Sequence, residues 1–198
     1  GTGKTAAFGL PMLNNITNRK AISSIILAPT RELAIQVHDE LVKLAKYEKL
    51  NVVAVYGGAP IHNQIRDIKR ANIVVGTPGR VLDHIRRGTL PLDSVEFLVL
   101  DEADEMLNMG FIDDMEEIMK SIPEERQTLL FSATMPAQIK KLTKKYLKED
   151  SVHIVIARKE LTGSTITQNF FEVNNSERFE TLCRLIDFDN PSAGIISC

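Results

Sequence analysis

The chain has 198 residues, 43% hydrophobic and 25% charged, which is typical of a soluble globular protein with one core or one domain plus part of another. No apolar run is long enough to cross a bilayer, and Cys183 and Cys198 form neither a disulfide framework nor a metal-type cluster, so we expect a reducing, cytoplasmic setting. Because the formal net charge is -2, any nucleic-acid binding must come from local residues rather than from bulk charge.

Short apolar, β-branched runs alternate with helical patterns along the chain, which is typical of βαβ units around a parallel sheet. The runs are almost continuously apolar, as expected for strands that are covered on both faces. Helical spacing of apolar residues from Leu33 to Ala45 predicts a helix there, and two more helices are predicted over residues 113–121 and 136–147. The predicted strands are residues 24–28, 51–56, 72–75, 96–100, 128–131 and 152–156.

The alternation breaks at residues 158–167, a polar stretch with one glycine that we interpret as an interdomain linker. Residues 168–173, 176–188 and 194–197 then predict a strand, a helix and a strand, the opening of a second β-α-β unit. A segment this short cannot bury a core alone. We therefore predict a first domain over residues 1–157, the linker, and a truncated second domain over residues 168–198.

The first five residues, Gly1-Thr2-Gly3-Lys4-Thr5, match the C-terminal half of the phosphate-binding loop GxxxxGK[ST]. Glycines in such a loop let backbone N–H groups approach phosphate oxygens, and the following helix N-terminus favours negative charge. Lys4 is then expected to reach the β- and γ-phosphates, and Thr5 to hold Mg²⁺ through its hydroxyl. The tripeptide alone is weak evidence and needs a carboxylate partner elsewhere.

Asp101 and Glu102 supply that partner, because they directly follow the apolar strand predicted at residues 96–100. Ligands in α/β sheets bind at the carboxyl ends of strands. Asp101 is the candidate metal ligand, and Glu102 is the candidate general base that polarises an attacking water. The bare segment fits an acidic turn at the start of a helix equally well, but the upstream phosphate loop favours the catalytic interpretation.

Residues 101–104 spell Asp-Glu-Ala-Asp inside the longer run VLDEADEMLNMGF. With the other motifs in order, the chain resembles the DEAD-box ATP-dependent RNA helicases of superfamily 2, over nearly its whole length. The further matches are residues 28–34 (APTRELA) to motif Ia, Gly57-Gly58 to the GG element, residues 77–80 (TPGR) to motif Ib, and residues 132–134 (SAT) to motif III.

This resemblance implies an α/β RecA-like P-loop domain, with a mostly parallel sheet flanked by helices, plus the first β-α-β of a second RecA-like domain. It implies ATP and Mg²⁺ as cofactors and RNA as the partner. Asp104 is expected to connect with Ser132 and Thr134 and so link nucleotide state to RNA binding. A helix over residues 81–87 is expected where the family bends one strand. The implied RNA-backbone residues are Pro29, Thr30, Arg31, Gly57, Gly58, Thr77, Pro78, Gly79 and Arg80.

Glycines and helix N-termini offer N–H groups to phosphates without reading bases, so RNA binding is expected to tolerate any sequence. Each RNA element also has a purely structural interpretation. Thr30 could cap a helix, Gly57-Gly58 could form a hinge, and residues 77–79 could form a plain turn. The lysines that follow Pro136 are interpreted as a solvated helix face rather than as an RNA patch; they are Lys140, Lys141, Lys144, Lys145 and Lys148.

The resemblance also implies a fragment truncated at both ends, with the family's adenine-recognising glutamine motif before Gly1 and the second domain's arginine-rich motif beyond Cys198. An arginine finger contributes roughly 10³–10⁵ in rate, so we expect this chain alone to be nearly inactive while its parent unwinds RNA or remodels RNA–protein complexes. Two alternatives remain: a DNA-directed helicase of the same superfamily, and an ATP-gated RNA clamp. A GTPase switch is set aside because the chain has no N-K-x-D tetrapeptide.

Overall fold

The computed structural model describes residues 3–156 and 169–196, which fall into two compact units, Gly1–Ser151 and Val152–Cys198. The linker predicted at residues 158–167 lies outside the described residues. No helix in the described parts is long and apolar enough to cross a membrane.

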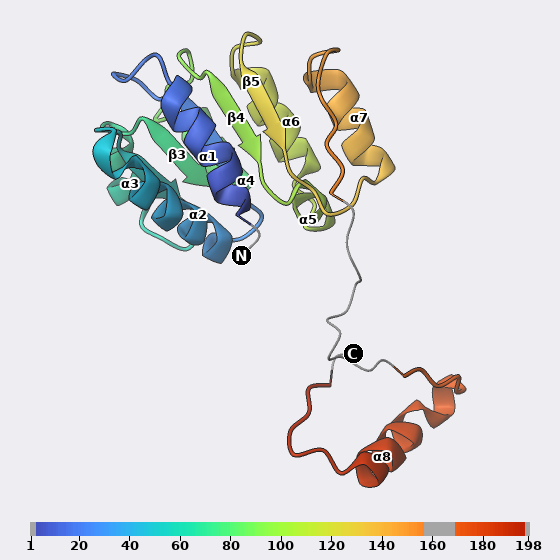
Figure 1. Ribbon diagram of the computed structural model, residues 1–198. Helices are drawn as coiled ribbons and strands as arrows, with labels where there is room; N and C mark the ends of the chain where they lie inside the picture. Colours follow the sequence, from blue (N-terminus) through green and yellow to red (C-terminus); the bar gives the residue numbers. More distant parts are fainter. Residues whose placement is uncertain (1–2, 157–168, 197–198) are drawn as a thin grey trace. The chain divides into compact units, whose positions relative to one another are not determined.

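The first unit is built on a five-stranded parallel sheet with the strand order β2-β3-β1-β4-β5 (Figure 1). Residues of β1, β3 and β4 are buried throughout, which explains why their sequences are continuously apolar rather than alternating. Five of the strands predicted from sequence are therefore confirmed, with ends that shift by at most one residue. Their bounds are Ser24–Leu27 for β1, Val52–Val55 for β2, Ile73–Gly76 for β3, Phe97–Leu100 for β4 and Gln127–Leu130 for β5.

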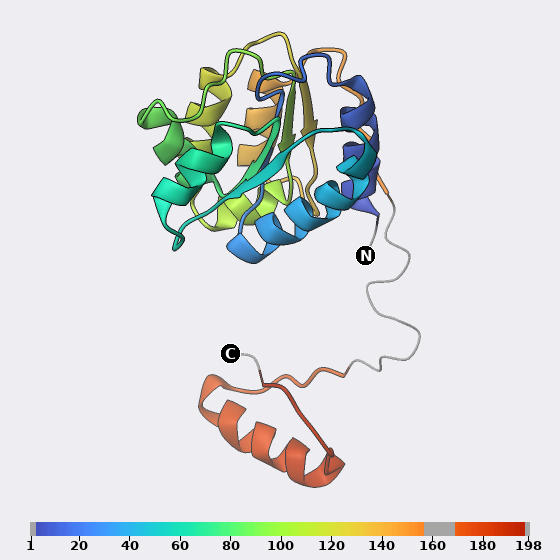
Figure 2. The same cartoon turned by 90° about the vertical axis from the view of Figure 1, so that its left-hand side faces the viewer.

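Helices cover both faces of this sheet, as a parallel sheet requires (Figures 1 and 2). Helices α1 (Lys4–Asn15) and α2 (Arg31–Leu44) pack on one face, where Phe8 and Leu41 meet Ile26. The other face is covered by the remaining helices of this unit, which are α3 (Ile61–Ile68), α4 (Pro78–Arg86), α5 (Ala103–Asn108), α6 (Ile112–Ser121) and α7 (Ala137–Tyr146). A 3₁₀ turn, Ala45–Tyr47, extends α2.

Three of the sequence predictions for the helices are confirmed: residues 33–45 lie in α2 and its 3₁₀ turn, 113–121 in α6 and 136–147 in α7. The helix implied at residues 81–87 is α4, which begins earlier, at Pro78, because proline is favoured in a first turn. The short helix α3 was not predicted, although Ile61, Ile65 and Ile68 recur in it at helical spacing.

The strand predicted at residues 152–156 is wrong: the structure shows no strand there. Val152 and Ile156 are 84% and 88% exposed, so these β-branched side chains have no described neighbour to pack against. A strand exists only when a second backbone completes its hydrogen bonds, and local composition cannot say whether that partner is present.

In the second unit, α8 (Arg178–Asp189) confirms the helix predicted at residues 176–188, and a 3₁₀ turn, Asn175–Glu177, precedes it. The flanking strands do not form in residues 169–173 or 194–196; Gln168 and Ser197 lie outside the described residues. No described residue of this unit is buried, which leaves a strand without a partner or a core.

Candidate nucleotide and RNA site

The five strands of the first unit end at one edge of the sheet because they are parallel, and the sequence-predicted site elements other than the phosphate loop follow these ends. Pro29 follows β1, Gly57 follows β2, Thr77 follows β3, Asp101 follows β4 and Ser132 follows β5. The topology thus brings together residues that are more than 100 positions apart in the chain. This carboxyl edge is where ligands of open α/β sheets bind.

The phosphate-loop residues open α1 at this edge. Gly3 has a left-handed backbone with φ 73°, which suits glycine, and helical hydrogen bonding begins with the Ala7 N–H donating to the Gly3 carbonyl at 3.0 Å. Lys4 and Thr5 lie in the first turn of α1, and Thr5 is 8% exposed. Gly1 and Thr2 lie outside the described residues.

Lys4 meets both acids that end β4. Its Nζ lies 2.6 Å from Asp101 Oδ1 and donates to Glu102 Oε1 at 3.3 Å. Burial by itself would lower the pKa of Lys4, but the contacts with the two carboxylates outweigh it and hold that pKa above its usual value. Burial raises the pKa of Asp101, and the ion pair with Lys4 opposes that shift without cancelling it.

Asp101 is 1% exposed, and among the described residues neither of its oxygens has a hydrogen-bond partner; its contact is the ion pair with Lys4. Buried carboxylates are normally hydrogen-bonded or bound to a cation. A hard cation held by this carboxylate and the Thr5 hydroxyl fits the oxygen chemistry that Mg²⁺ prefers.

Glu102 adopts a left-handed backbone, φ 53° and ψ 54°, at the point where β4 gives way to α5. Such a conformation in a residue other than glycine is uncommon and stores strain of about 1 kcal/mol or more. Its side chain is 38% exposed, so it reaches solvent where the Asp101 carboxylate does not. The two neighbouring acids therefore face different environments.

Asp104 is tied to the segment after β5 by several hydrogen bonds. Its carboxylate accepts from the Thr134 hydroxyl and N–H, both at 2.8 Å, and from the Ala133 N–H at 3.3 Å. The Asp104 N–H donates to Ser132 Oγ at 3.1 Å, and Ser132 Oγ donates to the Thr134 carbonyl at 2.6 Å. Burial would raise the pKa of Asp104, but these hydrogen bonds outweigh it and lower that pKa. The structure brings together the three residues expected to couple.

A scan against protein families matches the model described as DEAD/DEAH box helicase to residues 1–142. The chain belongs to the DEAD/DEAH box helicase family. It is 50% identical, over 99% of its length, to the DEAD-box ATP-dependent RNA helicase CshA of Bacillus cereus, and 55% identical to the ATP-dependent RNA helicase CshA of Listeria monocytogenes. It spans only 38% of the length of each of these relatives.

Solved structures agree with this family fold. A DEAD box protein from Methanococcus jannaschii matches 94% of the chain with 51% identity and a TM-score of 0.75, and the chain covers 50% of it. A hypothetical ATP-dependent RNA helicase from Sulfolobus tokodaii matches 75% of the chain with 41% identity and a TM-score of 0.70, and 44% of it is covered.

In this DEAD-box fold, two of the expected RNA elements lie against each other. The Arg31 guanidinium stacks 4.9 Å above the centre of the Tyr56 ring, and a Cβ built on Gly58 would lie 3.8 Å from Arg31 Nη1. Gly58 has φ 79°, a backbone conformation that favours glycine. The GG element thus places its exposed backbone beside a cationic side chain.

Pro29, Thr30 and Pro78 also perform structural tasks. Thr30 caps α2, because its Oγ1 accepts from the Leu33 N–H at 3.2 Å. Pro29 and Pro78 are buried, and Pro78 starts α4 directly after Thr77. Gly79 is exposed in that first turn. The capping interpretation of Thr30 is therefore realised, which leaves its backbone and Gly79 as the accessible groups.

Two of the five lysines that follow Pro136 contact acids of the same unit. Lys145 Nζ donates to Glu116 Oε2 at 2.7 Å, and Lys148 Nζ lies 3.6 Å from Glu125. Lys140, Lys141 and Lys144 are exposed. This arrangement agrees with a solvated helix face.

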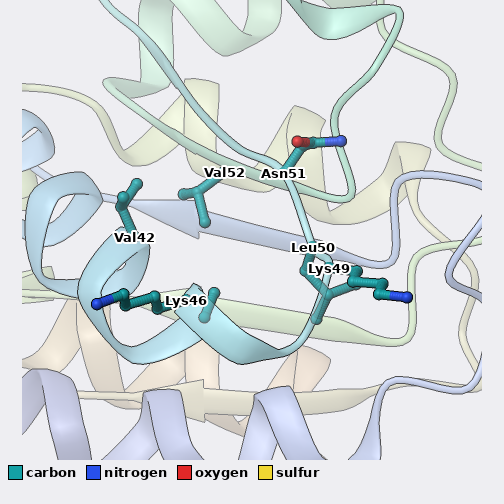
Figure 3. Close-up of a pocket in the computed structure, with 7 residues that line it drawn as sticks. Val42, Lys46, Lys49, Leu50, Asn51 and Val52 are labelled. Atoms are coloured by element: carbon teal, nitrogen blue, oxygen red, sulfur yellow. The ribbon is translucent and has the colours of Figure 1, made fainter.

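A hollow of about 630 Å³ lies away from the carboxyl edge (Figure 3). It is lined by Leu50, Asn51 and Val52, where β2 begins, and by Val42 and Lys46. It is therefore at the amino edge of the parallel sheet and takes no part in the candidate site.

Sequence reasoning missed two buried polar residues beside the RNA elements. Gln64 of α3 is 6% exposed and accepts from Arg80 of α4. His84, also of α4, is 0% exposed and contacts Gln64. A single glutamine or histidine carries no periodic signal, and a lone histidine is normally a satisfied core residue. Only the tertiary packing of α3 against α4 identifies them.

Proposed function

We propose that the full-length protein is a cytoplasmic, ATP-dependent RNA helicase that couples ATP hydrolysis to local unwinding of RNA or remodelling of RNA–protein complexes. The observation that carries the proposal is the convergence of Lys4, Asp101 and Glu102 at the carboxyl edge, beside the hydrogen-bonded trio of Asp104, Ser132 and Thr134. The family of the chain and the names of its relatives support the substrate classes.

Each side chain at this edge has a distinct role in the proposal. Lys4, together with the backbone of the phosphate loop, binds the triphosphate and exchanges its carboxylate partners for phosphate oxygens. Thr5 and Asp101 would hold Mg²⁺, which when bound neutralises charge on the transferring phosphate. Glu102 is solvent-accessible and therefore orients a water for attack and accepts its proton.

RNA binding is proposed to be independent of base sequence. Thr30, Gly57, Gly58 and Gly79 offer backbone N–H groups at one edge, and such groups contact phosphates without reading bases. The Thr77 N–H donates to the Val55 carbonyl at 3.1 Å, so Thr77 would contribute its hydroxyl instead. The contribution of Pro29, Pro78 and the two arginines, Arg31 and Arg80, is to shape this surface and to add positive charge. The trio around Asp104 links the nucleotide residues to the end of β5 and is proposed to transmit nucleotide state.

We also propose that the 198-residue chain alone hydrolyses little ATP. It spans 38% of the relatives named above, and an arginine finger from a second domain contributes roughly 10³–10⁵ in rate, or about 4–7 kcal/mol of barrier.

The test measures ATP hydrolysis by the full-length protein with RNA, with DNA and with neither. A Glu102→Gln variant is expected to lose RNA-stimulated turnover by at least ~100-fold, the scale of a lost general base, while it still binds nucleotide. Glu105→Gln, an exposed acid one turn away in α5, is the matched control and is expected to retain turnover.

Equal stimulation by DNA and RNA would contradict the RNA assignment and favour a DNA-directed helicase. RNA retention and ATP hydrolysis without strand separation would favour an RNA clamp. Robust RNA-stimulated turnover by the 198-residue chain would refute its proposed inactivity.

A further inference from the structure

A buried amide lies under the loop that carries the GG element. Gln64 Nε2 donates to the Tyr56 carbonyl at 3.0 Å, and Gln64 Oε1 accepts from Arg80 Nη1 at 3.0 Å. Arg80 Nη1 also donates to the Ala59 carbonyl at 3.0 Å. The same Gln64 oxygen lies 3.1 Å from His84 Nε2. One side chain therefore joins the end of β2, the loop after it and helix α4.

The chemistry of these partners fixes the orientation of each group. Arginine only donates, so the Gln64 atom facing Arg80 must be the oxygen. That oxygen cannot donate, so His84 Nε2 must carry a proton. Burial, and next the positive charge of Arg80, lower the pKa of His84, so the ring is neutral and its Nδ1 is an acceptor. The Thr89 hydroxyl lies 2.8 Å from Nδ1 and 3.1 Å from the His84 carbonyl, two acceptors that share its one proton.

The carbonyls of Tyr56 and Ala59 bracket Gly57 and Gly58, which are exposed. The loop is thus held at both ends by hydrogen bonds, from the buried Gln64 at Tyr56 and from the partly buried Arg80 at Ala59. Arg31 stacks on the Tyr56 ring from another element, so the position of this ring also bears on where the guanidinium lies. A displaced loop would move all these groups together.

We propose that Gln64 is a positioning residue for RNA binding: it fixes the loop of residues 56–59 and the Arg80 guanidinium in one arrangement before RNA arrives. This inference rests on the proposed function. Gln64 itself is buried and touches no ligand. Its effect is preorganisation, since two glycines in succession otherwise have many backbone conformations to lose on binding.

The experiment replaces Gln64 by methionine, which keeps the length of the side chain and removes its hydrogen bonds. In the full-length Gln64→Met protein, the RNA concentration for half-maximal ATPase stimulation is expected to rise about tenfold, the effect of roughly one to two lost hydrogen bonds. Turnover at saturating RNA and the affinity for a fluorescent ADP analogue are expected to stay within twofold. The Thr77 N–H donates to the Val55 carbonyl, directly before the loop, and its hydrogen exchange, measured without RNA, is expected to quicken at least tenfold.

Asn72→Leu is the matched control. Asn72 is also a buried amide, 5% exposed, whose Oδ1 accepts from the Asn51 N–H and whose Nδ2 donates to the Arg19 carbonyl, both at 2.9 Å. It lies just before β3, at the opposite edge of the sheet. This variant is expected to lower the melting temperature to a similar degree, without changing RNA affinity or exchange of the Thr77 N–H.

Gln64→Glu is a second variant in case the methionine protein does not fold. It keeps an acceptor for Arg80 and His84 but turns an oxygen toward the Tyr56 carbonyl, so faster exchange of the Thr77 N–H and weaker RNA binding are again expected. If a folded variant binds RNA within twofold of the wild type and exchanges at the wild-type rate, the inference is overturned. A wild-type protein that is neither bound nor stimulated by RNA would instead refute the proposed function, and the inference with it.

Discussion

The hydrogen bond between Thr134 Oγ1 and Asp104 Oδ2 can be measured by a double-mutant cycle. Thr134→Val removes the hydroxyl but keeps the branched shape, and Asp104→Ala removes the acceptor. The geometry is short, at 2.8 Å, and the carboxylate is charged, so the bond belongs to the stronger class. Loss of the pair is expected to detach the segment after β5 from α5.

The expected coupling energy between Thr134 and Asp104 depends on how exposed the two side chains are to water. A hydrogen bond to a buried charged group contributes about 1.5–3 kcal/mol. Thr134 is exposed and Asp104 is half-buried, so water replaces much of what is lost. We therefore expect a coupling energy of about 1 kcal/mol, and a larger total effect for Asp104→Ala, about 2 kcal/mol, since Asp104 also accepts from the N–H groups of Ala133 and Thr134.

The assay is urea unfolding of the wild type, both single variants and the double variant at pH 7. The coupling energy is the difference between the change in unfolding free energy of the double variant and the sum of the changes in the two single variants. A coupling below about 0.3 kcal/mol, the usual scatter for independent sites, would refute the role given to this hydrogen bond. Glu105→Ala, on the same helix but exposed, serves as the control for effects of helix composition.

Three further results are expected. The pKa of Asp104 is lowered in the folded state, so its ionised carboxylate stabilises the fold fully above the unfolded value of 3.8, and this stabilisation is lost as pH falls through the folded pKa. In urea titrations, the difference in stability between the wild type and Asp104→Asn is therefore expected to shrink in acid. Gly76→Ala is expected to lower the free energy of unfolding, measured in urea, by about 1–3 kcal/mol, since the added Cβ would come within 2.6 Å of the Val55 carbonyl oxygen. In the control Gly57→Ala, the added Cβ has no atom within 4 Å, and stability is expected to stay unchanged. Because burial disfavours the ionised Asp101, Asp101→Asn is expected to raise the melting temperature while it weakens Mg²⁺-dependent nucleotide binding in a titration calorimeter.

The sheet could be predicted from sequence because its strands are buried on both faces. Residues such as Ile25 and Ile26 of β1 face opposite helix layers and are both inaccessible, so the whole run is apolar and easily found. Val152 and Ile156 give the same local signal but form no strand, because pairing depends on a neighbour that composition does not reveal. An apolar, β-branched run in the sequence indicates that the segment tends to be buried, whereas a strand also needs a neighbouring strand to pair with.

Part of the candidate site could be predicted from short sequence motifs. The phosphate loop and the two acids after β4 could be assigned because each has a chemical requirement that few residues meet. The Lys4–Asp101 ion pair and the left-handed backbone of Glu102 could not be predicted, since they depend on how α1 meets the end of β4. Gln64 was missed for the same reason, because its partners come from the loop after β2 and from α4.

The strand order also bears on how the chain emerges from the ribosome. The central strand β1 pairs with β3 and β4, where Ser24 lies opposite Ile73 on one side and Phe97 on the other. Both partners are synthesised after β1. At roughly 5–20 residues per second, the first of these partners is synthesised about 2–10 seconds after β1. During that interval residues Ser24–Leu27, which are buried in the finished sheet, have no neighbouring strand with which to form backbone hydrogen bonds. A nascent chain arrested before β3 is therefore expected to be a substrate for chaperones that bind extended apolar segments, and one arrested well beyond β4 is expected to have escaped them.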